Sequence, residues 1–323
     1  MRKLARYRLL TAVILLGIPF VLTAAPTPVG EWLFNETGTI ANSTGSNTAL
    51  DLTLRNQTGA VADMHSADGL GVTGLAGDRA FDNRGATNMG VGPSGRADIA
   101  DSASNVLDSL GNFTLAGWFR TDPTASGTGA GWLFNNYLYS PGTGFTGYGL
   151  YFTDGQLRVV SGHYNGYDLA MSTPGAYAGS DTWIFFAAVY KGSGACPANC
   201  PSVTFYTGTR SSPVTLVNTV SGNGVFQGGA PYPEGQYFTI GSTSYFSGGN
   251  IVTGSPFDGL LDDMRIYGST LTASDVESVR SLAAVPVPAA AWLFMSALGA
   301  LPVSRRNGQR FLRASIPLAV RRE

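Results

Sequence analysis

The stretch of sequence that decides the fold covers residues 255–282 and reads SPFDGLLDDMRIYGSTLTASDVESVRSL. Residues 257–259, Phe-Asp-Gly, predict a turn, and residues 260–267 predict a strand with two adjacent aspartates in its middle. Because consecutive side chains of a strand point to opposite faces, Asp262 and Asp263 are expected to face opposite ways. A pair placed like this cannot act jointly on one substrate.

A short helix is expected directly after this strand. Thr272 and Asp275 match a capping box, in which the hydroxyl and the carboxylate each accept a backbone N–H at the start of the helix. Val276, Val279 and Leu282 follow at helical spacing and predict one apolar stripe. A turn, an acidic strand and a helix with a single apolar stripe therefore close the body of the chain.

The closing segment resembles the end of laminin G-like domains with a concanavalin A-like jelly-roll fold. Further segments that resemble this family occur in the family's order at residues 29–36, 41–47, 79–82, 112–119, 147–152, 183–190 and 238–241. The resemblance implies an all-β fold of two antiparallel sheets packed as a sandwich. It implies little about function, because this fold carries many unrelated activities.

Three runs in the middle of the chain indicate how two strands are buried and where a hairpin turns. Phe113, Leu115 and Phe119 alternate with more polar positions, which predicts a strand with one buried face. Residues 184–190 are continuously apolar, as expected for a central strand that is covered on both faces. Residues 153–156, Thr-Asp-Gly-Gln, predict a tight hairpin, since Asp-Gly supplies the positive φ of a primed turn.

Charge is distributed unevenly along the chain. The formal net charge is −1, yet ten of the 20 basic residues lie outside residues 26–284, where Glu323 is the only acidic residue. Residues 26–284 therefore hold 10 basic and 20 acidic side chains, a net charge of −10. A body with this charge repels phosphate backbones, which argues against nucleic acid as a partner and is compatible with Ca²⁺.

The N-terminus predicts a secretory signal. Four basic residues within residues 2–8 precede an apolar run at residues 9–22, and Thr-Ala-Ala follows at residues 23–25. The apolar run is short for a membrane span, which favours cleavage near Ala25 over an uncleaved anchor. Residues 1–25 are therefore expected to be a signal peptide, helical before its removal.

The C-terminus predicts a second address signal. The motif Val285-Pro286-Val287-Pro288 opens an apolar run that ends at Val303 and is followed by Arg305-Arg306. Residues 287–303 are just long enough for a transmembrane helix, whose arginines would stay cytoplasmic. The segment also resembles a PEP-CTERM sorting signal, which implies a Gram-negative envelope, processing by an exosortase in the inner membrane, and delivery to the cell surface or exterior.

These features divide the chain into four parts. They are a signal peptide (residues 1–25), a laminin G-like jelly-roll domain (26–284), a sorting and transmembrane segment (285–306) and a basic tail (307–323). The tail is expected either to lie along anionic lipid at the inner membrane or to have no role.

Cys196 and Cys200 are the only cysteines of the chain. In an exported protein, a disulfide that closes this small loop is the favoured interpretation. A metal site is disfavoured, because two thiolates need further ligands and the two histidines, His65 and His163, are distant in sequence.

The sequence argues against catalysis. A glycosidase needs two carboxylates that flank the sugar bond, and the β-glucanases that share this fold carry them close together on one strand. The only glutamates of residues 26–284 are Glu31, Glu36, Glu234 and Glu277, and none has such spacing. No catalytic residue is therefore assigned.

A structural Ca²⁺ is the one cofactor that the resemblance implies, held by oxygen ligands where the first and last strands of the body meet. The expected ligands are Glu36, Asn42, Asp262 and Asp263, with Asp82 less favoured. The alternative is that Asp262 pairs with Arg265 and that Asp263 is solvated.

Loops that combine tyrosines with amides and carboxylates are the candidate ligand sites. A tyrosine ring offers an apolar face and a hydroxyl, which suits the C–H faces and hydroxyls of sugars. The candidate residues are Tyr137, Tyr139, Tyr164, Tyr167, Asp168 and Tyr245. The alternative is that these rings pack under their own loops.

The sequence thus predicts an exported, non-catalytic surface or matrix protein that binds carbohydrate, with exopolysaccharide as the expected ligand. Two other functions stay open at this stage. One is a protein–protein adhesion or matrix-scaffold module, and the other is a divergent polysaccharide hydrolase or lyase.

Overall fold

The computed structural model describes most of the predicted jelly-roll domain. The residues it describes are 25–86, 95–100, 105–108, 110–122, 130–140, 144–163, 166–179, 181–192, 201–221, 237–247 and 250–284. The chain divides into two units, Met1–Val285 and Pro286–Glu323, and every described residue belongs to the first. No helix in these ranges is long and apolar enough to cross a membrane.

Several predictions fall outside the described residues. They concern the signal peptide apart from Ala25, the disulfide of Cys196 and Cys200, Tyr164, the sorting motif of Val285, Pro286, Val287, Pro288, Arg305 and Arg306, and the tail at residues 307–323. The predicted signal and transmembrane helices belong to this group and stay predictions.

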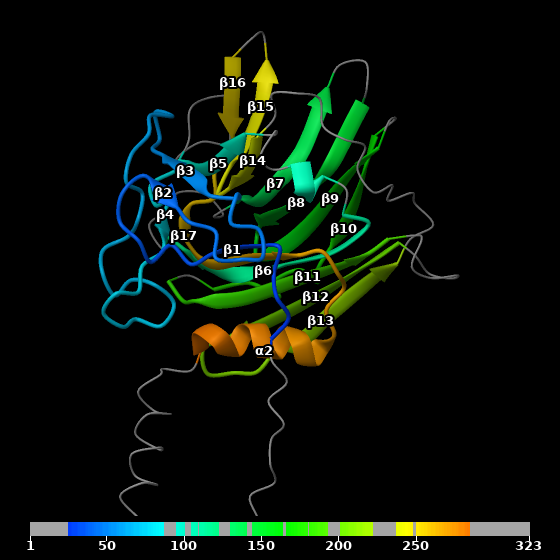
Figure 1. The fold of residues 1–323 in the computed structure, drawn as a ribbon. Coiled ribbons are helices and arrows are strands. Elements are labelled where there is room, and N and C mark those ends of the chain that lie inside the picture. Colours follow the sequence, from blue (N-terminus) through cyan, green and yellow to red (C-terminus); the bar gives the residue numbers. More distant parts are fainter. Residues whose placement is uncertain are drawn as a thin grey trace, which may run out of the picture. The chain divides into compact units, whose positions relative to one another are not determined.

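A seven-stranded antiparallel sheet forms one layer of the body (Figure 1). Its strand order is β1 (Gly30–Trp32), β17 (Gly259–Tyr267), β6 (Asn112–Thr121), β11 (Ile184–Lys191), β12 (Ser202–Thr209) and β13 (Thr215–Ser221), with β4 (Phe81–Asp82) also paired to β17. The fold-deciding strand β17 therefore lies between the first strand of the body and β6.

An eight-stranded antiparallel sheet forms the second layer. Its order is β10 (Gly166–Met171), β9 (Gln156–His163), β8 (Gly144–Thr153), β7 (Gly131–Ser140), β14 (Tyr237–Ile240), β5 (Arg96–Ala100), β3 (Leu52–Arg55) and β2 (Ile40–Ala41). A separate hairpin, β15 (Thr243–Ser247) and β16 (Asn250–Gly254), follows β14, and a short 3₁₀ helix covers Asn105–Leu107. The predicted two-sheet antiparallel sandwich is confirmed.

Aromatic pairs join the two sheets across the main core. The rings of Trp32 and Phe238 stack with centroids 5.5 Å apart, those of Phe113 and Tyr148 are 4.3 Å apart, and those of Phe119 and Phe152 are 4.9 Å apart. In each pair, one ring comes from each sheet. The alternation of apolar residues along the strands therefore sets the face that each sheet buries.

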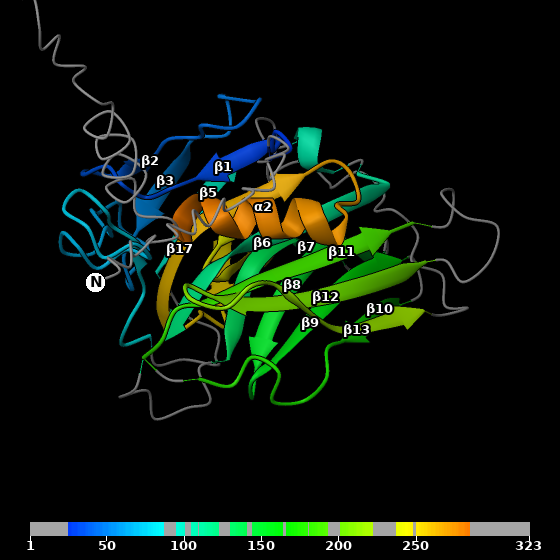
Figure 2. The same cartoon turned by 90° about the horizontal axis from the view of Figure 1, so that it is seen from below.

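A second hydrophobic core lies between the seven-stranded sheet and helix α2 (Ala273–Ala284), which crosses the outer face of that sheet (Figure 2). The predicted capping box is present: Asp275 N–H donates to Thr272 Oγ1 at 3.2 Å, and Thr272 N–H donates to Asp275 Oδ2 at 2.9 Å. Val276 and Val279 are fully buried in this core.

Two details of burial differ from the sequence prediction. Leu282 was expected on the apolar stripe of α2 but is 56% exposed, and Ala283 takes its place at 4%. Position 283 is seven residues after Val276 and returns to the same helix face, whereas position 282 does not. Strand β6 was expected to bury one face, yet Thr114 and Trp118 are also fully buried, because α2 covers the far side of the sheet.

Two local predictions are confirmed. Strand β11 is buried on both faces over Ile184–Tyr190, as its continuous apolar sequence predicts. The hairpin between β8 and β9 pairs Thr153 with Gln156, and Asp154 and Gly155 adopt φ values of 50° and 69°, as a primed turn requires.

Candidate functional site

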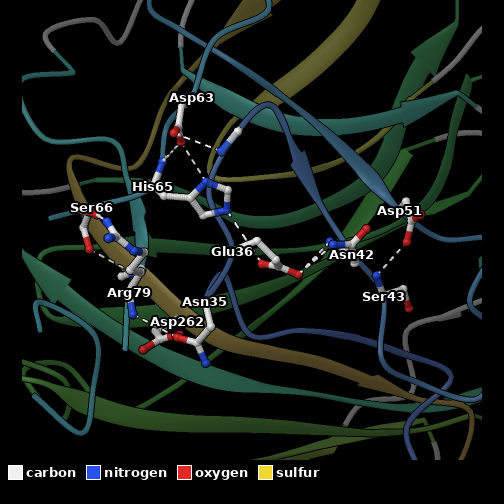
Figure 3. Close-up of polar contacts among 12 residues, drawn as sticks. Asn35, Glu36, Asn42, Ser43, Asp51, Asp63, His65, Ser66, Arg79 and Asp262 are labelled. Atoms are coloured by element: carbon white, nitrogen blue, oxygen red, sulfur yellow. Dashed lines mark hydrogen bonds and ion pairs between the residues drawn. The ribbon is translucent and has the colours of Figure 1, made fainter. Parts of the chain in front are cut away.

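The expected calcium ligands Glu36 and Asn42 bond to each other at the start of the body (Figure 3). Glu36 Oε1 accepts hydrogen bonds from the backbone and side-chain N–H groups of Asn42, both at 3.1 Å. The second oxygen, Glu36 Oε2, lies 3.8 Å from Nε2 of His65, whose side chain is 1% exposed. These residues form a local polar cluster in the segments that follow β1, β2 and β3.

Asp63 holds the other side of the His65 ring in this cluster. Its Oδ1 lies 2.8 Å from His65 Nδ1 and also accepts the backbone N–H of His65 at 3.0 Å, while Oδ2 accepts the N–H of Gly38. Burial opposes the charge, but the backbone N–H groups of His65 and Gly38 outweigh it and hold the pKa of Asp63 below its ordinary value. The carboxylate therefore anchors two loop segments.

The aspartates of β17 do not alternate as the strand pattern predicts. The pairing of β17 with β6 shifts between Asp262 and Arg265, and Asp263 adopts a φ of 50°. Both side chains are buried, at 1% and 8% exposure. The expectation that they face opposite ways on a regular strand is wrong, because a β-bulge interrupts the strand at this point.

Each of the two aspartates has its own partners. Asp262 accepts the N–H of Val72 at 2.7 Å and of Asp263 at 2.8 Å. Asp263 Oδ1 lies 3.4 Å from Nη2 of Arg265, whose Nε donates to Glu31 Oε1 at 2.6 Å. The ion pair of Arg265 is thus with Asp263 rather than with Asp262.

The expected calcium ligands do not share one set of contacts. Glu36 and Asn42 bond to each other, whereas the partners of Asp262 and Asp263 include Val72 and Arg265. Across the described ranges, no three His, Cys, Asp or Glu side chains are grouped closely enough to hold a metal ion. The less favoured Asp82 forms an ion pair with Arg84, with Nη2 and Oδ2 2.6 Å apart. The calcium site stays a prediction, and melting with and without a chelator would test it.

Asp262 gives the stability of the fold a pH dependence with a definite sign. Burial of the carboxylate, with a further contribution from the neighbouring Asp263, raises the pKa of Asp262 well above its ordinary value. The folded state therefore keeps this proton at pH values where the unfolded chain has lost it. This contribution to the free energy of unfolding is complete below the unfolded pKa of about 3.9 and declines as the pH rises through the raised pKa of the folded state.

We expect Asp262→Asn to flatten this decline, because an amide does not titrate and its carbonyl still accepts one backbone N–H. Urea unfolding at a series of pH values from acidic to mildly alkaline measures the slope. Asp68→Asn is the matched control, since Asp68 is exposed and also accepts a backbone N–H, that of Gly77, at 2.6 Å. Equal slopes for Asp262→Asn and the parent protein would contradict the assignment.

An aromatic groove of about 270 Å³ lies on the outer face of the eight-stranded sheet, which is turned away from the other sheet. Its lining residues are Trp132, Tyr137, Tyr151, Arg158, Val160, Leu169 and Ser255. They come from β7, β8, β9, β10 and the residue after β16. On β8, Leu150 and Phe152 point into the core, so Tyr151 between them points outward.

Trp132 is the centre of the aromatic groove. Its ring stacks on Tyr137 with centroids 5.9 Å apart and planes at 22°, and it meets the ring of Tyr151 edge-on at 5.3 Å. A Cβ atom on Gly149 would come within 2.4 Å of the Trp132 ring. Glycine at this position of β8 therefore lets the indole lie close over the sheet.

Two polar side chains on the same face lack hydrogen-bond partners in the described part of the chain. Asn135 pairs with Gly149 across the strands, is 1% exposed, and has no partner for its Oδ1 or Nδ2. Arg158 lines the groove, and its buried Nε also has no partner. Burial raises the pKa of Tyr151, while the positive charge of the nearby Arg158 acts in the opposite direction.

One of the predicted ligand residues, Tyr137, lies in the aromatic groove. Tyr139, Tyr167, Asp168 and Tyr245 belong to β7, β10 and β15, but their side chains lie outside the described part of the structure. The sequence interpretation missed Trp132, Tyr151 and Arg158 as site residues, because it searched the loops and these residues lie within strands. Alternation along those strands was the available signal: in β8 and β9, the residues between core positions point outward.

A second hollow, of about 590 Å³, lies at the ends of β4 and β6. Its lining residues are Asp82, Arg84, Gly85, Arg120, Thr121, Asp122, Asp181 and Leu260. The two arginines are engaged by aspartates: Arg84 pairs with Asp82, and Arg120 Nε donates to Asp181 at 2.8 Å. Its cations are therefore already neutralised within the molecule.

Known structures share this fold at low sequence identity. The binding domain of botulinum neurotoxin DC in complex with rat synaptotagmin II matches with a TM-score of 0.50 and 9% identity, over 80% of this chain and 52% of that chain. A structure of botulinum neurotoxin type C, whose cell entry depends on interaction with two ganglioside molecules, matches with a TM-score of 0.50 and 9% identity. This match covers 80% of this chain and 51% of that chain. The chain thus spans about half the length of these neurotoxin chains.

A smaller bacterial domain also matches. The CBM40 of the Ruminococcus gnavus IT-sialidase, bound to α2,3-sialyllactose, matches with a TM-score of 0.42 and 15% identity, over 60% of this chain and 94% of that chain. No curated protein sequence matches the chain. The family model described as the concanavalin A-like lectin/glucanases superfamily matches residues 94–277. Since this match covers more than half of the 323 residues, the chain belongs to the concanavalin A-like lectin/glucanases superfamily.

Proposed function

We propose that this protein is a non-catalytic carbohydrate-binding protein and that the aromatic groove is its binding site. The stacked pair of Trp132 and Tyr137 on an outward sheet face is the observation that carries the proposal. Flat rings pack against the C–H faces of sugars, and nearby polar groups bond to the hydroxyls. Arg158 and Ser255 supply such polar groups in the lining.

The chemistry of the groove supports binding rather than hydrolysis. A glycoside hydrolase needs two carboxylates on either side of the scissile bond. The described lining residues contain none. The superfamily includes both lectins and glucanases, so the distinction depends on the groove and not on the fold.

The fold neighbours are compatible with this proposal. Cell entry of botulinum neurotoxin type C depends on interaction with two ganglioside molecules, and the TM-score of that structure to this chain is 0.50. Gangliosides carry sugars, so this fold can serve carbohydrate recognition. The identity of 9% transfers no ligand, and the sugar bound by this chain has to be found by experiment.

We place the protein at the cell surface or in the extracellular matrix, with exopolysaccharide as its ligand. The signal-like residues 1–25 and the sorting-type residues 285–306 support this location. Fractionation of cells that produce the chain with and without residues 285–306 tests it. Intact protein in the soluble cytosol in both cases would contradict export.

A panel of polysaccharides and oligosaccharides tests the function directly. We expect saturable binding to at least one member of the panel, measured by calorimetry or by the change in tryptophan fluorescence, and no release of reducing ends or unsaturated products. Product release would identify a hydrolase or lyase instead. Absence of binding to every member at millimolar sugar would overturn carbohydrate binding and favour a protein partner.

A further inference from the structure

Arg158 is the one charged residue among the described lining residues of the aromatic groove. It lies on β9, where Leu157 and Val159 on either side of it point into the core, so its side chain leaves the sheet on the groove side. Leu169 and Val160, directly paired across β9 and β10, form the apolar part of the lining. A guanidinium group therefore lies at the junction of the aromatic and aliphatic parts.

The charge of Arg158 has no counter-ion within the described residues. No ion pair or hydrogen bond of its side chain is found there, and its Nε is buried without an acceptor. The buried arginines of the chain differ from the half-buried Arg158: Arg265 pairs with Glu31 and Asp263, and Arg96 donates to Asp98 at 2.7 Å. An arginine always keeps its charge, so an anionic ligand would supply the counter-ion that the described residues do not provide.

The surroundings favour an anionic ligand at this position. The body has a net charge of −10, which repels acidic polymers in general, yet no acidic residue is among the described lining residues. The two terminal nitrogens of a guanidinium form a fork of parallel N–H donors, which fits the two oxygens of a planar carboxylate. Aromatic rings beside the fork would hold the ring of the same sugar.

We propose that the aromatic groove selects saccharides that carry a carboxylate, such as uronic acid residues, with the sugar ring on Trp132 and Tyr137 and the carboxylate on the fork of Arg158. This inference depends on the proposed function, because it names the class of sugar that the same groove binds. Neutral saccharides bind through the rings alone and therefore bind more weakly.

Paired ligands test the selection separately from binding itself. The full-length protein in detergent is titrated by calorimetry with oligogalacturonate and with its carboxyl-reduced, neutral counterpart. We expect oligogalacturonate to bind about ten- to hundredfold more tightly, the usual effect of a hydrogen bond to a charged group. Added salt should lower the affinity for the acidic ligand and leave the affinity for the neutral ligand unchanged.

Variants assign the difference to one residue. Arg158→Gln should bind both ligands equally, at the affinity of the parent protein for the neutral one, and Arg158→Lys should keep part of the preference. Because no described residue bonds to Arg158, both variants should have the same melting temperature as the parent protein. Equal binding of the two ligands by the parent protein would overturn the selection and leave carbohydrate binding in place. If Arg158→Gln keeps the full preference for the acidic ligand, Arg158 does not bind the carboxylate. If the parent protein binds neither ligand and no other glycan, the proposed function is contradicted.

Discussion

Replacement of Arg265 by methionine is expected to lower the free energy of unfolding by about 3–5 kcal/mol, the range found when one partner of a buried ion pair is removed. Arg265 is 3% exposed and lies on β17 directly opposite Glu31 of β1. Its Nε donates to Glu31 at 2.6 Å, and its Nη1 donates to the backbone oxygen of Asp263 at 3.2 Å. Methionine fills similar volume but leaves the buried Asp263 and the partly buried Glu31 without their cation.

Guanidinium chloride unfolding measures this loss, with an unchanged m-value as the sign that stability alone has changed. Arg84→Met is the matched control, because Arg84 is 41% exposed and its pair with Asp82 should contribute about 1 kcal/mol or less. Adding Glu31→Gln to Arg265→Met should restore part of the loss, since it removes one stranded charge. A loss below about 1 kcal/mol in Arg265→Met would show that the pair contributes little.

Replacement of Trp132 by alanine should raise the Kd for the preferred glycan by at least about 30-fold, the usual effect of removing a central aromatic contact. The indole contacts both Tyr137 and Tyr151, so its loss also frees the two neighbouring rings. The fold should persist, because Trp132 lies outside the two hydrophobic cores. Calorimetric titration with the strongest ligand of the glycan panel gives the ratio.

The control for this variant is Tyr206→Ala on β12 of the other sheet. Tyr206 is half-buried and packs against the second hydrophobic core, so its replacement removes a comparable ring at a place outside the groove. It should leave glycan affinity unchanged. If Trp132→Ala binds as the parent protein does while melting normally, the ligand lies elsewhere on the molecule and the groove is not the site.

Much of the fold was predictable because it depends on local patterns. The capping box at Thr272 and Asp275 determines where α2 begins, and the Asp-Gly pair at residues 154–155 determines the hairpin between β8 and β9. The bulge at Asp262 and Asp263 was not predictable in the same way. It depends on the register between β17 and β6, which are far apart in sequence.

The residues of the aromatic groove were predictable only in part, for the same reason. Tyr137 was found from its tyrosine- and amide-rich surroundings, but Trp132, Tyr151 and Arg158 meet only because β7, β8 and β9 pair in one register. The role of Gly149 follows from the Cβ that it lacks, and the indole above it comes from the neighbouring strand. Periodicity indicates which residues leave a sheet face, while the register decides which of them become neighbours.

The pairing of β1 with β17 has a consequence for how the molecule acquires its structure. Gly30 is paired with Ile266, so the first described strand can pair only after the last described strand, β17, has been made, and β17 alone connects it to β6. Such long-range pairing slows the search for the native topology and places it after synthesis of the whole body. A product cut short before residue 259 would leave Trp32 without the strand that holds it in place.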